Sequence, residues 1–212
     1  MRVFVDNVKF RCLSEGDRED FEFLEECDTA YASNVGERLI QTLASLENAM
    51  SGFQITRLEH CLQSTTRAWF DGADIDWIVS TLLHDIGDIH APYDHDEYAA
   101  LILRPFVREQ CTWTVKHHGD FQKFYFAAQL DEDPDVRDRY QDEPYFDDCV
   151  QFCELWDQIS FDPSYTSLSI DFFSPYVMEV FNRKPYETAV IKSGERVGLT
   201  NPDVAHIRKR AA

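Results

Sequence analysis

A histidine and an aspartate, His84 and Asp85, stand side by side at the end of an almost wholly apolar run, residues 77–83 (WIVSTLL). The run predicts a buried helix, which carries the pair toward the interior. Burying two such polar groups costs several kcal/mol unless a partner compensates them. We expect that partner to be a metal ion, and the fold must then bring further ligands to the same end of the helix.

Helical periodicity dominates the rest of the chain. Asn34 and Glu37 predict a capping box at a helix start, Asp74 is expected to cap the helix that precedes His84, and Gly72 suits a helix C-terminus. The expected helices cover residues 38–46, 55–70, 75–86, 96–109, 112–130, 144–158 and 171–183.

Strand patterns are few. Residues 3–10 alternate weakly, and residues 188–197 are a candidate hairpin. The sequence has no internal repeat and no linker rich in Pro, Gly or Ser. We therefore expect a single all-α domain over residues 1–212, a helical bundle with an irregular start, a loose C-terminal tail and a metal site in its core.

Six side chains are candidate metal ligands: His60, His84, Asp85, His95, His118 and Asp157. Four imidazoles and two carboxylates suit two divalent first-row metal ions, because carboxylates supply charge and can bridge. The six fall on or beside five expected helices, as in bundles that build metal sites from facing helices. A lone histidine on an apolar helix is more often a hydrogen-bonded core residue, but the adjacent His-Asp pair favours metal binding.

The other histidines and the cysteines are weaker candidates. His117 points about 100° away from His118 on a helix, so it is expected to support the site or line a cavity. His90 and His206 are expected at the surface. The six cysteines contain no CxxC pair, which argues against disulfides and thiolate ligation. Cys149 and Cys153 are expected to be small buried side chains.

Charge and hydropathy exclude several kinds of partner. Lys and Arg number 20 against 39 Asp and Glu, a formal net charge of -19. Nucleic acid and anionic membranes reward clustered positive charge, so neither is expected as a partner. The N-terminal residues lack the apolar core of a signal peptide, and no run approaches the roughly 18 apolar residues of a membrane span. We expect a soluble, cytoplasmic protein with a small-molecule substrate; the oligomeric state is left open.

Four motifs of the chain resemble the HD-domain superfamily. They are residues 58–63 (LEHCLQ), 82–88 (LLHDIGD), 115–118 (VKHH) and 155–158 (LWDQ). The resemblance covers roughly residues 50–185. Within that superfamily the chain is most similar to the mixed-valent diiron oxygenases, which include myo-inositol oxygenase and the phosphonate-cleaving oxygenases, and to a group described only as predicted HD phosphohydrolases.

The resemblance implies two iron ions, Fe(II) and Fe(III), with O2 as co-substrate. One iron would take His60, His84, Asp85 and Asp157, and the other would take His95 and His118, with Asp85 bridging both. The resemblance implies that His84 and Asp85 are the residues most directly tied to catalysis. The implied chemistry is that of an oxidoreductase, a dioxygenase of phosphonate catabolism. It removes a hydrogen atom from substrate carbon and cleaves the C–P bond of a 1-hydroxyalkylphosphonate to a carboxylic acid and phosphate.

The chain departs from that branch around the substrate. Asp88 stands where those relatives carry Lys or His, and Phe53 and Glu154 stand where a gating Glu and an anion-binding Arg are expected. The candidate substrate contacts are Asp88, the basic side chains Arg57, Lys116 and Lys123, and the neutral donors Gln63, Gln122 and Gln158. A carboxylate near the aromatic helix 121–126 (FQKFYF) suggests a pocket for a trimethylammonium end group. Residues 89–94 and the stretch before His60 are the expected entrance loops.

Two other functions are consistent with the same ligands. A metal-dependent phosphohydrolase would use Mn, Mg or Fe to activate a water molecule on a small phosphate ester. The motifs lack a nearby basic cluster, which disfavours nucleotides and polyphosphates, and the Gly-Tyr-Pro signature of cyclic-dinucleotide phosphodiesterases is absent. A non-catalytic HD module is the third possibility, and retention of all six ligand candidates argues against it.

Overall fold

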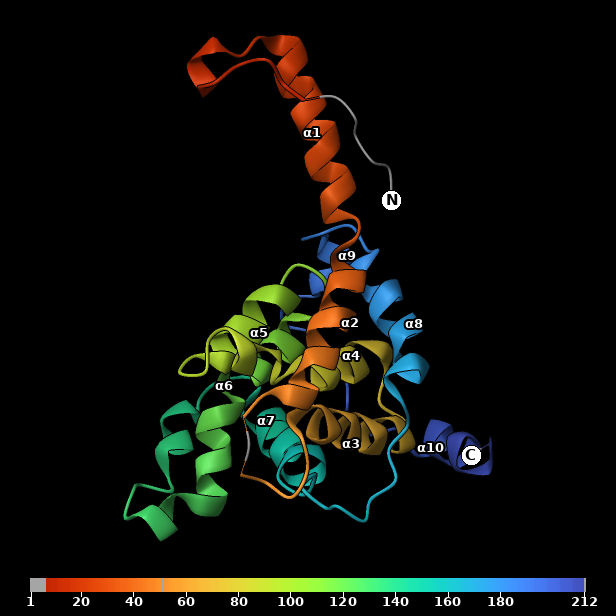
Figure 1. Cartoon of the computed structure of the whole chain (residues 1–212). Helices are drawn as coiled ribbons and strands as arrows, with labels where there is room; N and C mark the ends of the chain where they lie inside the picture. The colour runs from red at the N-terminus through yellow and green to blue at the C-terminus, as the bar shows by residue number, and fades with distance from the viewer. Residues whose placement is uncertain (1–6, 51, 212) are drawn as a thin grey trace.

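The computed structural model describes residues 7–50 and 52–211, and in that part of the chain it contains helices and no strands (Figure 1). The α-helices are α1 (Arg18–Ala32), α2 (Val35–Ser45), α3 (Arg57–Phe70), α4 (Ile75–Leu83), α5 (His95–Leu103), α6 (Glu109–Phe126), α7 (Phe146–Phe152), α8 (Ile170–Phe181), α9 (Thr188–Ile191) and α10 (Pro202–Ala211). The shorter elements are η1 (Leu13–Glu15), η2 (Leu46–Asn48), η3 (Ile86–Ile89), η4 (Ala127–Leu130), η5 (Val136–Tyr140) and the π-helical turn η6 (Cys153–Asp157). The all-α prediction is confirmed for the described residues.

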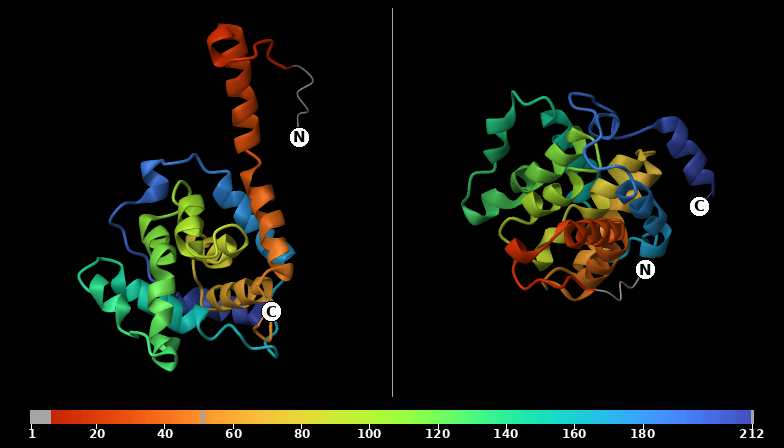
Figure 2. Two further views of the ribbon diagram at one scale, coloured as in Figure 1. Left: turned by 60° about the vertical axis from the view of Figure 1, so that its left-hand side comes forward. Right: turned by 90° about the horizontal axis from the view of Figure 1, so that it is seen from above.

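Helix α1 stands apart from the bundle. It projects away from the other helices in both side views, and α2 leads from it into the body (Figures 1 and 2). None of its residues is buried. A capping box between Asp17 and Asp20 fixes its start. An irregular segment was predicted here, and that prediction was wrong because residues 18–32 form a helix.

Helices α3 and α4 form the centre of the body and pack against each other. Thr56 and Glu59 form the capping box of α3, and Asp74 caps α4 by accepting from the Trp77 backbone N–H, as predicted for Asp74. Gly72 ends α3 with φ +81°, and a Cβ there would lie 2.2 Å from the Asn201 carbonyl oxygen. Only glycine fits this left-handed, crowded turn.

Other helices of the body pack around this pair and on one another. α5 packs on α6, α6 on α7, and α8 on both α4 and α2. The core they share is aromatic, with fully buried side chains from Trp77, Trp156, Phe121, Phe152 and Phe173. None of the helices in the described ranges combines the length and apolarity of a membrane span.

Several local predictions were wrong. The candidate hairpin at 188–197 is instead the short helix α9 followed by a loop. Gly194 lies in this loop and has a positive φ of +76°. Asn34 precedes α2 without capping it through its side chain. The candidate strand at 3–10 begins outside the described residues, and its described part, 7–10, is irregular.

Candidate metal centre

All six predicted ligands lie near one another, although they come from separate elements. His60 lies in α3, His84 and Asp85 follow the last turn of α4, His95 opens α5, His118 lies in α6 and Asp157 ends η6. Five of them are fully buried, and the His95 side chain is 23% exposed. His95 is therefore the one candidate ligand that solvent partly reaches, and we refer to its side of the site as the open side.

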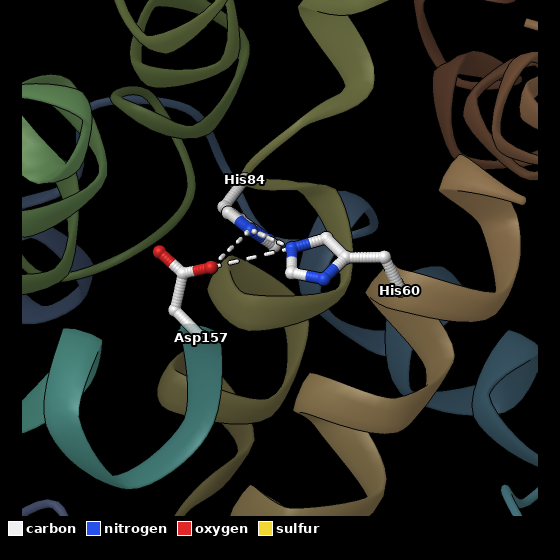
Figure 3. Close-up of side chains that lie close together, drawn as sticks. All are labelled: His60, His84 and Asp157. Carbon is white, nitrogen blue, oxygen red and sulfur yellow. Dashed lines mark hydrogen bonds and ion pairs between the residues drawn. The ribbon is translucent and has the colours of Figure 1, made fainter. Parts of the chain in front are cut away.

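The tightest group joins His60, His84 and Asp157 (Figure 3). The two Nε2 atoms lie 3.1 Å apart, and Asp157 Oδ1 lies 3.3 Å from that of His60 and 3.7 Å from that of His84. Atoms that share a metal at about 2.0–2.2 Å lie about 3.0–3.6 Å from one another. The three atoms are thus spaced almost as ligands of one metal ion.

Asp85 lies between this group and the other two histidines. Its Oδ2 is 3.4 Å from His60 Nε2 and 3.5 Å from His84 Nε2. Its Oδ1 is 3.4 Å from His95 Nε2 and 3.3 Å from His118 Nε2. One carboxylate therefore presents each of its oxygens to a different pair of imidazoles.

Backbone carbonyls orient three of the imidazoles. The Nδ1 atoms of His60, His84 and His118 lie 2.9, 2.7 and 2.6 Å from the carbonyl oxygens of Ser160, Thr81 and Val115. A carbonyl oxygen can only accept, so each Nδ1 carries the proton and each Nε2 turns toward the centre. Such outer hydrogen bonds fix the ring and tautomer of metal-ligating histidines.

This arrangement fits a cation. When both rings are neutral, the Nε2 atoms of His60 and His84 each carry a lone pair, and the two atoms lie 3.1 Å apart. Two lone pairs at this distance repel each other. Asp157 Oδ1 is buried and accepts no hydrogen bond from the described residues. Asp85 Oδ2 accepts none either, although the Arg57 guanidinium lies 2.9 Å from it. Orphaned acceptors of this kind are costly unless an ion satisfies them. The buried cluster of His60, His84, Asp85, His118 and Asp157 could hold a metal ion.

The carboxylates and imidazoles shift one another's pKa. Burial alone would raise the pKa of Asp85 and Asp157, but the histidines around them, and Arg57 beside Asp85, hold both below the usual range. Burial would lower the pKa of His84 and His118, but the neighbouring carboxylates raise both. The metal-free centre therefore stabilises protons on these two rings, which a metal must displace.

Aromatic side chains close the site on two sides. Behind it, the Phe152 ring packs edge-on against His84, with centroids 5.7 Å apart, and against His118 at 6.3 Å. In front of His60, Phe161 stacks on the imidazole at 4.3 Å, and Phe53 stacks on Phe161 at 4.8 Å. The expected entrance stretch before His60 thus contributes Phe53 to the cover.

The three glutamines predicted as substrate contacts each hydrogen-bond to another part of the protein. Gln122 donates to Asp157 Oδ2 at 2.5 Å and so supports a ligand. Gln63 is bonded to the backbone of Asp162 through both ends of its amide. Gln158 reaches the Glu154 carbonyl one turn back.

The charged candidates are also separated by the structure. Lys116 pairs with Glu97 at 3.0 Å and is about half exposed, and Lys123 pairs with Asp120 at 3.5 Å. Asp88 lies beside the site, with Oδ1 3.8 Å from His95 Nδ1.

The other histidines lie where the sequence places them. His117 packs between the rings of Trp113 and Tyr140, both at 4.5 Å, and contributes no atom to the centre. His90 and His206 are exposed. All six cysteines are free, with Cys149 and Cys153 buried.

Three residues of the site had little or no signal in the sequence: Phe161, Arg57 and Ser160. Phe161 had no motif to mark it, since its stacking on His60 depends on the loop after η6. Arg57 was one of three basic candidates, although its place one helical turn before His60 put it on the same face of α3. The carbonyl of Ser160 that orients His60 has no sequence signal, because every residue has a carbonyl.

Fold and site together define an all-α protein with a buried His/Asp cluster that could hold a metal ion. A comparison with protein-family models found no match, and a comparison with curated proteins found none either. The resemblance to the HD-domain superfamily therefore stays a prediction that rests on the four motifs.

Proposed function

We propose that the protein is an HD-domain enzyme with a dinuclear iron centre, an O2-dependent oxygenase that cleaves the C–P bond of a 1-hydroxyalkylphosphonate. The observation that carries the proposal is the position of Asp85, with Oδ2 3.4–3.5 Å from His60 and His84 and Oδ1 3.3–3.4 Å from His95 and His118. A carboxylate that lies between two pairs of imidazoles is placed to bridge two metal ions.

In the proposed reaction the substrate and O2 give a carboxylate, phosphate and a proton. The C–H and C–P bonds at the hydroxylated carbon break, and the products contain two more oxygen atoms than the substrate. When bound, the iron pair supplies a Lewis acid for the substrate and the redox chemistry of O2. His84 and Asp85 are the residues closest to both proposed positions.

The chain's own residues prepare this site. The carbonyls of Ser160, Thr81 and Val115 hold three rings with Nε2 inward, and Gln122 holds Asp157. Phe152 and Phe161 exclude water from the two closed sides. The open side at His95 is left for the substrate.

Hydrolysis of a small phosphate ester is the competing proposal, since the same ligands could hold Mn or Mg. Phosphoryl transfer needs several cationic groups on the developing charge. In the described part of the chain, one guanidinium, that of Arg57, pairs with a ligand. This scarcity of positive charge favours the oxygenase.

An oxygen electrode distinguishes the two. Iron-loaded protein supplied with 1-hydroxyethylphosphonate is expected to consume O2 and release phosphate in equal amounts, and to release none without O2. Phosphate release from p-nitrophenyl phosphate under argon, with no O2 uptake on the phosphonate, would favour the hydrolase. The Asp85→Asn variant is the control for adventitious iron.

A further inference from the structure

Arg57 is the basic side chain that reaches the candidate metal centre. Its Nη2 lies 2.9 Å from Asp85 Oδ2, and its Nε lies 2.5 Å from Asp88 Oδ2. The side chain is only 10% exposed. Lys116 and Lys123 are paired on the surface and far more exposed, so of the three basic candidates Arg57 is the one in place.

The fold holds this guanidinium rigidly. Arg57 is the first residue of α3, and the capping box of Thr56 and Glu59 fixes that end of the helix. The Phe53 ring covers one face of the guanidinium, with its centroid 5.5 Å from Cζ. An arginine with a fixed helix position and a stacked face loses little further freedom on binding a ligand.

The hydrogen-bonding capacity of Arg57 is only partly used. A guanidinium has five N–H donors. Within the described chain Arg57 donates one hydrogen bond, from Nε to Asp88. Its Nη2 contacts Asp85 Oδ2 as an ion pair but does not form a hydrogen bond with that oxygen. The two terminal nitrogens therefore keep donors for a ligand. The guanidinium is linked to the His95 side of the centre by Asp88, which accepts from Arg57 Nε through Oδ2 while its Oδ1 lies 3.8 Å from His95 Nδ1.

Asp88 is correspondingly committed. Its carboxylate is 8% exposed and pairs with Arg57 through Oδ2, while Oδ1 faces His95 Nδ1 at 3.8 Å. It therefore offers no free negative charge to a trimethylammonium group. Its effect is to aim the guanidinium, just as a carboxylate aims a neighbouring histidine.

We propose that Arg57, oriented by Asp88, is the residue that binds an anionic group of the substrate at the open side of the centre. The inference rests on the proposed function and deepens it, because it names the residue and the sign of the charge recognised. A carboxylate, phosphate or phosphonate group matches the planar fork of the guanidinium, whereas a quaternary ammonium group does not.

Binding of methylphosphonate to Mn(II)-loaded protein tests the assignment without turnover. Isothermal titration is expected to give a Kd about 10–100-fold weaker in Arg57→Gln, since a charge-assisted pair is lost. Arg57→Lys should lie between the two, because it keeps the charge and loses the fork. Arg18→Gln, the same change at a side chain that is 90% exposed on α1, should bind like the wild type. Choline, the cationic probe, should not bind the wild type.

The outcomes separate the inference from the proposed function. Equal methylphosphonate affinity in wild type and Arg57→Gln, or binding of choline in its place, would overturn the assignment alone. Metal content measured on each variant gives the second control. Loss of metal in Arg57→Gln and in Arg57→Lys would make Arg57 a support of Asp85 and overturn its role in substrate binding. A wild type that retains no metal would count against both proposals.

Discussion

Replacing Asp157 by asparagine should remove one metal ligand while keeping its shape. The carboxylate is fully buried, its Oδ1 accepts no hydrogen bond within the described chain, and its Oδ2 accepts from Gln122. An asparagine can still accept from Gln122 through its carbonyl oxygen, but its NH2 cannot ligate a metal. The metal-free variant is therefore expected to fold, and the change should appear in metal binding.

The size of the effect follows from linkage. Metal at 1,000 times its Kd stabilises the folded state by about 4.1 kcal/mol. For a chain of this length that corresponds to a rise in Tm of about 8–16 °C. Loss of a residue that only supports a ligand weakens metal binding by about 10–100-fold. We take the upper end of that range, about 100-fold, for loss of the ligand itself. At the same metal concentration the stabilisation then falls to about 1.4 kcal/mol, a rise of about 3–6 °C.

Differential scanning calorimetry with and without Mn(II) measures both shifts. Asp148→Asn is the matched control, because Asp148 is also a buried carboxylate but pairs with Arg196 and Gln110 away from the site. That variant is expected to lose stability with its metal-induced rise unchanged. An undiminished metal-induced rise in Asp157→Asn would refute the assignment of Asp157 as a ligand.

Three further predictions test the surroundings of the site. Metal affinity should begin to fall while the pH is still above about 6.5, the ordinary histidine value, because the pKa values of His84 and His118 are raised above it. Each displaced proton then costs tenfold in affinity per pH unit. Titration calorimetry in buffers of different ionisation enthalpy should detect proton release at pH 6, and no release would contradict this prediction. Gln122→Leu should weaken metal binding about 10–100-fold by freeing Asp157, as measured by competition with a chelator, with an unchanged Kd as the contrary result. His117→Ala should keep its full metal content by mass spectrometry of the native protein, whereas His118→Ala should lose metal; equal loss in both would contradict the different directions of the two rings.

The elements that position the site could be predicted because their signals are local. Asp74 and Gly72 mark the start of α4 and the end of α3, and both act in the structure as the sequence indicates. Helix α1 could not be predicted in the same way, since it buries no residue and so has no core-facing apolar face to follow. Residues 188–197 show a different error, because they were predicted as a candidate hairpin and the chain forms the short helix α9 there instead.

The metal ligands could be predicted from their chemistry, but the hydrogen bonds and ion pairs that orient the residues of the site could not. The adjacent pair His84 and Asp85 requires a compensating partner wherever it is buried, and this requirement needs no knowledge of the fold. The bond from His60 Nδ1 to the Ser160 carbonyl joins positions 100 residues apart and depends on where the chain turns after η6. The pairing of Asp88 with Arg57 is of the same kind, and it changes what Asp88 can bind.

Metal analysis of anaerobically purified protein, followed by electron paramagnetic resonance after partial oxidation, tests the central claim most directly. We expect two iron ions per chain and an S = 1/2 signal from a mixed-valent pair, which shifts when a 1-hydroxyalkylphosphonate is added. Manganese or magnesium in place of iron, or iron without that signal, would contradict the proposed oxygenase centre.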